Sequence, residues 1–213
     1  MAGKAVCMIA VLMCLVLAGC GKTPVVPYVA PASGPTANLR IVTNSEVSGR
    51  VFEGCPIQGQ LMAKAGRFKN DRPNINNPQY PLNPATLDMA RRAFPPLPEY
   101  MPPTRMAGGF YREVAAEYVV PAGKPFAMHT VGASAGGGMS TYFVCPRATR
   151  VFEFQAGKDY EAVIGIVKVP LTEGGHAVQC VFSVRRLLDA EGVETPLLFP
   201  VRPAVTPDPQ CKK

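Results

Sequence analysis

The sequence predicts a mainly β protein with the architecture of an antiparallel β-sandwich, immunoglobulin-like or related, interrupted by a Pro-rich irregular region and one short helix. Two observations support this fold class. The C-terminal half alternates short β-branched and aromatic segments with Gly-rich breaks. The 213 residues include 23 prolines and 20 glycines, which disfavour long helices. Apolar residues make up 47% of the chain, which is enough for the core of one domain with a tail.

The N-terminal part of the predicted domain holds two short strands and then a long irregular region. The strands are "LRIVTN" at 39–44 and "GRVFEG" at 49–54, each bounded by turn-forming residues. Residues 55–109 carry "DRPNINNPQYPLNP" and "FPPLPEYMPP", whose prolines interrupt both helices and strands. A loop region of this length is expected to be a folded excursion over the domain or a surface for a partner.

One helix is expected inside the irregular region, over "ATLDMARRAF" at 85–94. Asn83 is a suitable N-cap, and Pro84 suits the first helical turn. Leu87, Arg91 and Phe94 recur at helical spacing, and the pattern ends before the next proline. The sequence therefore predicts a short amphipathic helix.

From residue 110 onwards the chain predicts seven strands. All are short, apolar on alternate positions and closely spaced, as in a sandwich or a barrel. They are "FYREVAAEYVV", "KPFAMHTV", "STYFVCP", "TRVFEF", "DYEAVIGIVKV", "HAVQCVFSVRRL" and "TPLLFP". One phrase recurs among them, "VPAGKPF" at 120–126 and "FQAGKDY" at 154–160. It indicates two similar hairpin connections, with a duplicated ligand loop presenting Lys124 and Lys158 as the alternative.

The N-terminus has the pattern of an export signal. Lys4 supplies one positive charge, and residues 5–18 form an apolar run that is too short to span a bilayer but has the length of a signal-peptide core. The run ends in "LAGC", residues 17–20, which resembles the lipobox of bacterial lipoprotein precursors. The resemblance divides the chain into a signal peptide at 1–19, a Pro/Gly-rich tether at 20–38, a β-sandwich domain at 39–200 that includes the irregular region, and a C-terminal tail at 201–213.

The same resemblance implies a location. In lipoproteins the lipobox cysteine, here Cys20, receives a diacylglycerol, becomes the first residue of the mature chain and is then N-acylated. Several acyl chains together give stable membrane attachment without a spanning helix. Position 21 is Gly and not Asp, and by resemblance to enterobacterial sorting this favours the outer membrane. We therefore expect a lipid-anchored protein of the cell envelope that faces the periplasm.

The cysteines fit an exported chain. Two of the seven lie in the signal peptide and Cys20 is the expected lipid site, which leaves Cys55, Cys145, Cys180 and Cys211. An even number in an oxidising compartment predicts disulfides, and four cysteines allow three pairings. Residues at alternate positions of a strand share a face, so Cys145 groups with apolar Phe143, and Cys180 with Val178, Phe182 and Val184. We expect both to point inward as Cys145–Cys180, leaving Cys55–Cys211 by elimination.

No catalytic or cofactor motif stands out. "GASAG" at 132–136 matches G-x-S-x-G, and Asp159 and His176 follow Ser134 in hydrolase order, but glycines and then a strand follow where the motif requires a helix. Met128, His129 and Met139 suggest a copper site only weakly, because scattered Met residues in a β-core are far commoner. No C-x-x-C pair exists and the chain has two histidines, so neither a zinc site nor any other cofactor is expected.

Three functions remain open from the sequence. The first is a non-enzymatic envelope lipoprotein that binds another envelope protein or a glycan, as an accessory part of a larger assembly. The second is a hydrolase that uses Ser134, and the third is a periplasmic carrier of a metal or a small ligand. The net charge of +7 is spread along the chain, and nucleic-acid binding does not suit a protein at this location.

Overall fold

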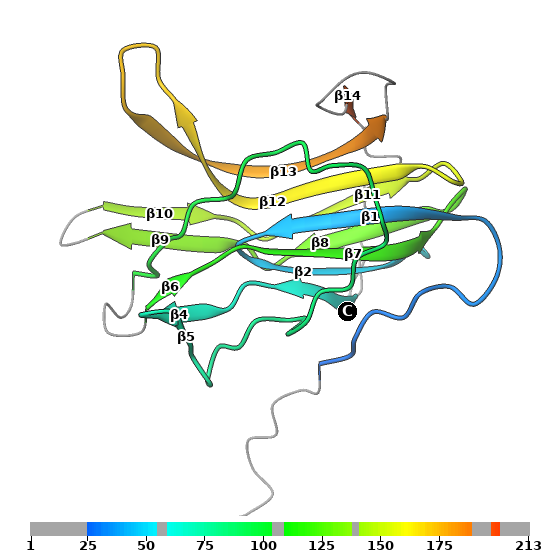
Figure 1. The fold of residues 1–213 in the computed structure, drawn as a ribbon, viewed down its shortest axis with the longest axis horizontal. Helices are drawn as coiled ribbons and strands as arrows, with labels where there is room; N and C mark the ends of the chain where they lie inside the picture. The colour runs from blue at the N-terminus through cyan, green and yellow to red at the C-terminus, as the bar shows by residue number, and fades with distance from the viewer. Residues whose placement is uncertain (1–24, 55–58, 104–108, 138–140, 189–196, 201–213) are drawn as a thin grey trace, which may run out of the picture.

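The fold is a sandwich of two β-sheets, seen in a computed structural model that describes residues 25–54, 59–103, 109–137, 141–188 and 197–200 (Figure 1). The predicted fold class is confirmed. The five-stranded sheet has the order β14-β13-β12-β1-β7, and the four-stranded sheet has the order β11-β8-β2-β3. The strands of the first sheet are β1 (Thr36–Thr43), β7 (Val114–Pro121), β12 (Asp159–Pro170), β13 (His176–Leu188) and β14 (Leu197–Pro200), and those of the second are β2 (Glu46–Val51), β3 (Gln60–Lys64), β8 (Pro125–Thr130) and β11 (Ala148–Glu153).

Strand β1 lies inside the five-stranded sheet with two neighbours of opposite type. It runs antiparallel to β7 and parallel to β12, with Asn38 opposite Asp159. The remaining pairs of both sheets are antiparallel within the described residues. The prediction of a purely antiparallel sandwich therefore holds for every pair except β1–β12.

The two Ala-Gly-Lys turns carry the chain between the sheets, so the predicted hairpin connections are wrong. The first turn links β7 to β8 and the second links β11 to β12, and each of these pairs has one strand in each sheet. Gly123 and Gly157 have positive φ angles of 67° and 66°, which Gly adopts without a steric penalty. The Gly123 N–H donates to the Phe154 carbonyl at 2.8 Å. Phe154 follows β11 and precedes the second Ala-Gly-Lys turn, so this bond links the two turns.

The core lies between the two sheets and is rich in aromatic side chains. Phe126, Phe152 and Phe154 are fully buried, and Phe154 also contacts the Tyr160 ring at 4.8 Å between centroids. Further residues from both sheets fill the space, among them Leu39, Ile41, Val47, Met62, Met128, Ala162 and Ile164. The inward positions alternate along the strands, as the sequence pattern predicted.

The region predicted as irregular contains more strand than expected. β3 completes the four-stranded sheet, and β4 (Arg67–Lys69), β5 (Arg72–Pro73) and β6 (Phe110–Tyr111) form a small third sheet. The Gly-rich run after residue 132 is also a strand, because β9 (Ala133–Gly137) pairs with β10 (Thr141–Cys145). Of the seven strands predicted from residue 110 onwards, six are present as single strands, and the first, at 110–120, is divided into β6 and β7, which belong to different sheets.

The predicted helix at 85–94 does not form, and the described part of the chain contains no helix at all. Asp88 has a φ of 55°, outside the helical range. Carboxylates of the five-stranded sheet accept the backbone N–H groups of this segment, including those of Leu87 and Phe94. Bonds to the sheet therefore replace the helical hydrogen bonds that the local sequence favoured.

Residues 25–38, assigned above to the tether, lie against the β-domain. β1 already begins at Thr36, and residues 25–29 run along the outer edge of β3. The Tyr28 N–H donates to the Leu61 carbonyl at 2.9 Å, and the Leu61 N–H donates to Val26 at 2.8 Å. The Tyr28 ring meets Tyr118 and Phe126 edge to face. Among the described residues, the β-domain therefore already includes residues 26–38 and does not begin at 39.

Among the residues that the structure describes, no helix has the length and apolar character needed to cross a membrane.

Candidate functional site

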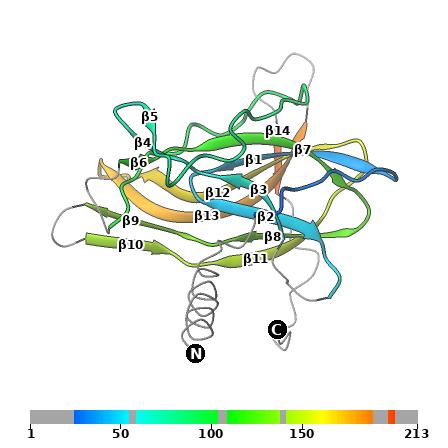
Figure 2. The same ribbon diagram turned by 90° about the horizontal axis from the view of Figure 1, so that it is seen from below.

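Two long hairpins extend beyond the body of the sandwich and form the most distinctive surface of the molecule (Figures 1 and 2). The β8–β11 hairpin continues as β9–β10, and the β12–β13 hairpin turns at residues 171–175. The change of direction between β8 and β9 lies at Gly132, whose φ is 84°. A Cβ there would lie 2.3 Å from the Cys145 carbonyl oxygen, so only Gly fits this position.

The Cys145–Cys180 disulfide joins the two hairpins, which confirms the predicted pair. The two Cα atoms are 5.4 Å apart. Cys145 lies on β10 and is buried, as expected. Cys180 lies on β13 and is exposed, so the expectation that both cysteines point into the core is wrong for Cys180. The apolar face of β13 enters the core only from Phe182 onwards, and Val178 is exposed beyond it.

The inner face of the β9–β10 hairpin is closed by a small apolar cluster. Cys145 and Phe143 contact a group that includes Ile166 of β12 and Tyr100. The Tyr100 ring stacks on Tyr111 at 5.3 Å, and its hydroxyl donates to the Asn44 carbonyl at 2.8 Å. Burial raises the pKa of Tyr100 well above its ordinary value. The cluster packs the base of the hairpin against Tyr100 and Ile166.

The outer face of the same hairpin is apolar and exposed. Tyr142 and Val144 alternate with the inward residues and are 67% and 48% exposed. Val131 at the start of the hairpin, and Leu171 and Val178 on the β12–β13 hairpin, are also large apolar residues open to solvent. Three exposed apolar residues therefore belong to one hairpin and two to the other, and the disulfide joins these two hairpins.

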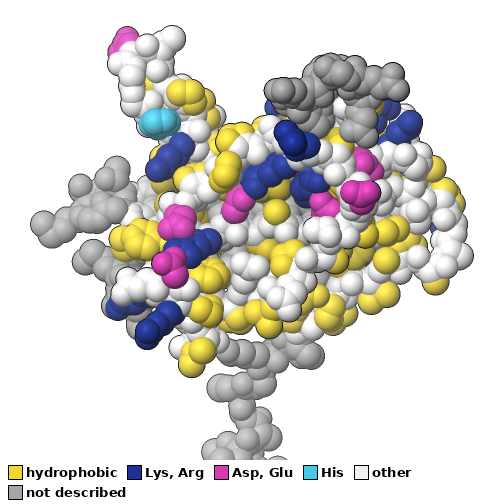
Figure 3. All heavy atoms as spheres, viewed as in Figure 1, with side chains coloured by type: hydrophobic (Ala, Val, Ile, Leu, Met, Phe, Trp, Pro, Cys, Tyr) yellow, Lys and Arg dark blue, Asp and Glu magenta, His cyan; other side chains and the backbone are white. Residues whose placement is uncertain are grey.

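A second feature is a row of charges across the outer face of the five-stranded sheet. Glu117 of β7, Arg40 of β1, Glu161 of β12 and Arg185 of β13 occupy facing register positions. Arg40 binds Glu117 at 2.8 Å and Glu161 at 3.1 Å, and all three side chains are almost fully buried. Figure 3 shows acidic and basic side chains gathered over the upper half of this face.

The charge row is covered by the segment at 85–98. The Phe94 N–H donates to Glu161, and the Ala90 carbonyl accepts from Arg40 at 2.8 Å. The Phe94 ring lies against the Arg185 guanidinium at 4.7 Å. Because the charged side chains of this row bond to the backbone of the covering segment, the row holds that segment against the sheet and has a structural role. The sequence did not predict this row, although Arg40 and Glu117 are the single charged residues of β1 and β7.

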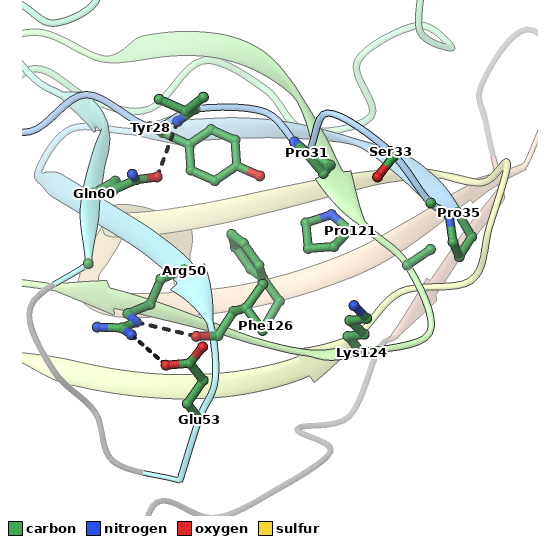
Figure 4. A pocket seen from close by; sticks show the side chains of 15 residues that line it. Tyr28, Pro31, Ser33, Pro35, Arg50, Glu53, Gln60, Pro121, Lys124 and Phe126 are labelled. Atoms are coloured by element: carbon green, nitrogen blue, oxygen red, sulfur yellow. Dashed lines mark hydrogen bonds and ion pairs between the residues drawn. The ribbon is translucent and has the colours of Figure 1, made fainter.

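A shallow pocket of about 470 Å³ lies between the N-terminal segment and the first Ala-Gly-Lys turn (Figure 4). Tyr28 lines it, with its hydroxyl bonded to the Val119 carbonyl at 3.1 Å, and burial raises the pKa of this tyrosine to about 12. Arg50 pairs with Glu53 at 3.2 Å on one side, and exposed Lys124 lies on another. The pocket combines apolar groups with charged groups of both signs.

The structure does not assemble the residues of the hydrolase alternative. Ser134 lies within β9 opposite Val144, in a strand and not in a strand-to-helix turn. Asp159 begins β12, whereas His176 lies opposite Pro170 at the other end of that strand. Eleven residue steps along β12 separate Asp159 from Pro170, which corresponds to about 35 Å. Asp159 accepts a hydrogen bond from the Asn38 side chain instead.

The described residues do not support a copper site at Met128 and His129. Met128 is buried in the core, and His129 bonds Thr149 at 2.9 Å through its Nδ1 atom. Met139 lies outside the described residues. Among the residues that are described, no group of three or more His, Cys, Asp or Glu side chains is placed to hold a metal ion. Lys124 and Lys158 follow the two sheet-crossing turns, and Lys124 lines the shallow pocket.

Three residues of the predicted site lie outside the described residues: Cys20, the expected lipid site, and Cys55 and Cys211, the second disulfide candidate. Their predicted roles remain predictions. No protein-family model, curated protein or solved structure matches the chain.

Proposed function

We propose that the protein is a lipoprotein of the bacterial cell envelope, anchored through Cys20 to the outer membrane and facing the periplasm, whose β-sandwich binds another envelope protein and catalyses no reaction. The lipobox-like "LAGC" after an apolar run supports the anchor. The Cys145–Cys180 disulfide supports export, because disulfides form and persist in oxidising compartments.

The exposed apolar surface of the two linked hairpins carries the binding part of the proposal. Soluble proteins rarely leave a group of large apolar side chains in solvent, and where they do the group often serves as an interface. Aromatic residues are enriched in such interfaces, and Tyr142 lies near the tip of β9–β10. The disulfide keeps the two hairpins from moving independently, which lowers the entropy cost of binding.

Photocrosslinking in intact cells tests the binding surface. A photoreactive phenylalanine analogue is placed at Tyr142, and at Leu82 as a control that is 75% exposed on another part of the chain. We expect a discrete crosslinked protein from position 142 and none from position 82. A glycan adduct at 142 would change the class of partner, and equal labelling at both positions would remove the argument for this surface.

The anchor is tested separately through Cys20. We expect Cys20→Ser to accumulate as an unprocessed precursor and to lose labelling by radioactive palmitate. If that variant is processed normally and stays in the membrane fraction, the lipoprotein assignment is wrong. Stoichiometric labelling of Ser134 by a fluorophosphonate probe would favour the hydrolase alternative instead.

A further inference from the structure

We propose that the edge of the four-stranded sheet formed by residues 25–30 lies against the surface of the lipid bilayer. The proposal rests on the lipidation of Cys20 proposed above and adds a defined orientation to it. Val26 makes the first backbone hydrogen bond to the domain, so six residue steps separate the attached chain from Cys20. A fully extended chain of this length spans at most about 22 Å. This side of the domain therefore cannot move far from the lipid headgroups.

The segment is fixed to the sheet and presents apolar side chains outward. Its backbone is bonded to Leu61 on both sides of Pro27, and the Tyr28 ring is inserted toward the core. Val25, Val26 and Val29 are 60%, 57% and 69% exposed. In Figure 3, hydrophobic side chains extend along the lower border of the molecule, the side on which the described chain begins in Figure 1. An apolar edge of this kind suits the boundary between headgroups and acyl chains.

Basic groups lie next to the apolar edge. Lys124 and Arg50 line the pocket that Val29 also borders, and Arg50 is paired with exposed Glu53. Lys and Arg side chains close to a membrane surface are attracted by anionic lipids. The occupant that fits both the apolar residues and the short link to Cys20 is thus the bilayer in which the acylated cysteine is anchored.

This orientation leaves both hairpins directed away from the anchored edge. In Figure 1 the tip of the β12–β13 hairpin lies at the top of the view and the β9–β10 hairpin extends to the left, whereas the described chain begins below the body of the sandwich. The anchored edge and the exposed apolar surface of the hairpins therefore point in different directions. A partner reaches the hairpins from the periplasm without competing with the lipid surface.

Tryptophan fluorescence tests the orientation, because the natural chain contains no Trp and each substitution gives a single-site signal. The four variants are Val26→Trp, Val29→Trp, Tyr142→Trp and Leu82→Trp. Each full-length lipidated protein is placed in phosphatidylethanolamine–phosphatidylglycerol vesicles whose acyl chains carry bromine, a short-range quencher. We expect quenching at positions 26 and 29 to exceed that at positions 142 and 82 by at least twofold. Circular dichroism checks that all four variants are folded.

A longer link provides the matched control. Twelve Gly/Ser residues inserted after Lys22 lengthen the link between Cys20 and the attached chain. Treated as a flexible coil, the lengthened link has a root-mean-square length of about 23 Å. We expect the quenching at positions 26 and 29 to fall by at least half while the protein still floats with the vesicles. Equal quenching at all four positions before the insertion would overturn the orientation with the anchor intact, whereas selective quenching at positions 26 and 29 that persists after the insertion would show that the apolar edge binds the bilayer without the short link. A protein that carries no lipid and does not float would instead refute the anchor and this inference with it.

Discussion

The buried charge row predicts that Arg40→Met will be strongly destabilising. The substitution keeps most of the side-chain volume but removes the cation between Glu161, whose side chain is 0% exposed, and Glu117, at 10%. Removing one partner of a buried ion pair typically costs about 3–5 kcal/mol, because the other charge is left without compensation. Here two carboxylates lose their partner and the Ala90 carbonyl loses its donor. We therefore expect a loss of about 4–5 kcal/mol.

That loss is a large fraction of the stability of a domain, which is typically about 5–15 kcal/mol. For a domain of this size, each kcal/mol lowers the Tm by about 2–4 °C, so the expected shift is about 8–20 °C. Urea unfolding of the soluble chain, without the signal peptide and with Cys20 replaced by Ser, measures the free energy by circular dichroism. Arg50→Met is the matched control, since it breaks an exposed ion pair with Glu53 and should cost less than about 1 kcal/mol.

A double variant distinguishes the charge from the packing. Adding Glu161→Gln to Arg40→Met removes one of the uncompensated charges, so the pair should be less destabilising than the sum of the two single variants by about 1–3 kcal/mol. If Arg40→Met costs no more than Arg50→Met, or if the two losses simply add, the reasoning about the buried row is refuted.

Three further predictions concern other parts of the fold. Cys145→Ala/Cys180→Ala opens a loop with a sequence separation of 35 and should cost about 4 kcal/mol on the chain-entropy relation, measured by thermal unfolding with and without reductant; no change in Tm would contradict it. Burial lowers the pKa of His129, so the unfolded state binds the proton more readily. Stability should therefore fall as the pH drops below about 6.5, and His129→Gln should reduce that fall in urea titrations at pH 7 and 5. Gly165→Ala would place a Cβ 2.0 Å from the Asn44 Oδ1 atom at a φ of 139° and should cost about 3 kcal/mol or more, with wild-type stability as the contrary result.

The strands were predictable because their signals are local. Alternating apolar residues in "DYEAVIGIVKV" and "HAVQCVFSVRRL" identify β12 and β13, and the same parity selected the correct partner for Cys145. Parity does not say where a strand leaves the core, and β13 extends beyond it at Cys180. The exposed side of the disulfide therefore could not be read from the alternation.

The helix prediction failed because its deciding contacts are distant in sequence. Asn83, Pro84 and the spacing after them favour a helix locally. The competing acceptors are Glu117 and Glu161, 30 and 67 residues away from the N–H groups they bind. A single sequence does not reveal that these carboxylates share one face with Arg40, because the register of β1 against β7 and β12 sets that arrangement.

The parallel pairing of β1 with β12 also has a consequence for how the chain acquires its structure. Asn38 faces Asp159, so a strand made early in synthesis gains one of its two neighbours only after more than a hundred further residues. Contacts of such high sequence separation slow folding, since a long loop must close before they form. Until then one edge of β1 is open to pairing with other chains, a recognised route to aggregation. Completion of the five-stranded sheet is therefore a late event in folding, and β1 keeps one unpaired edge until β12 joins it.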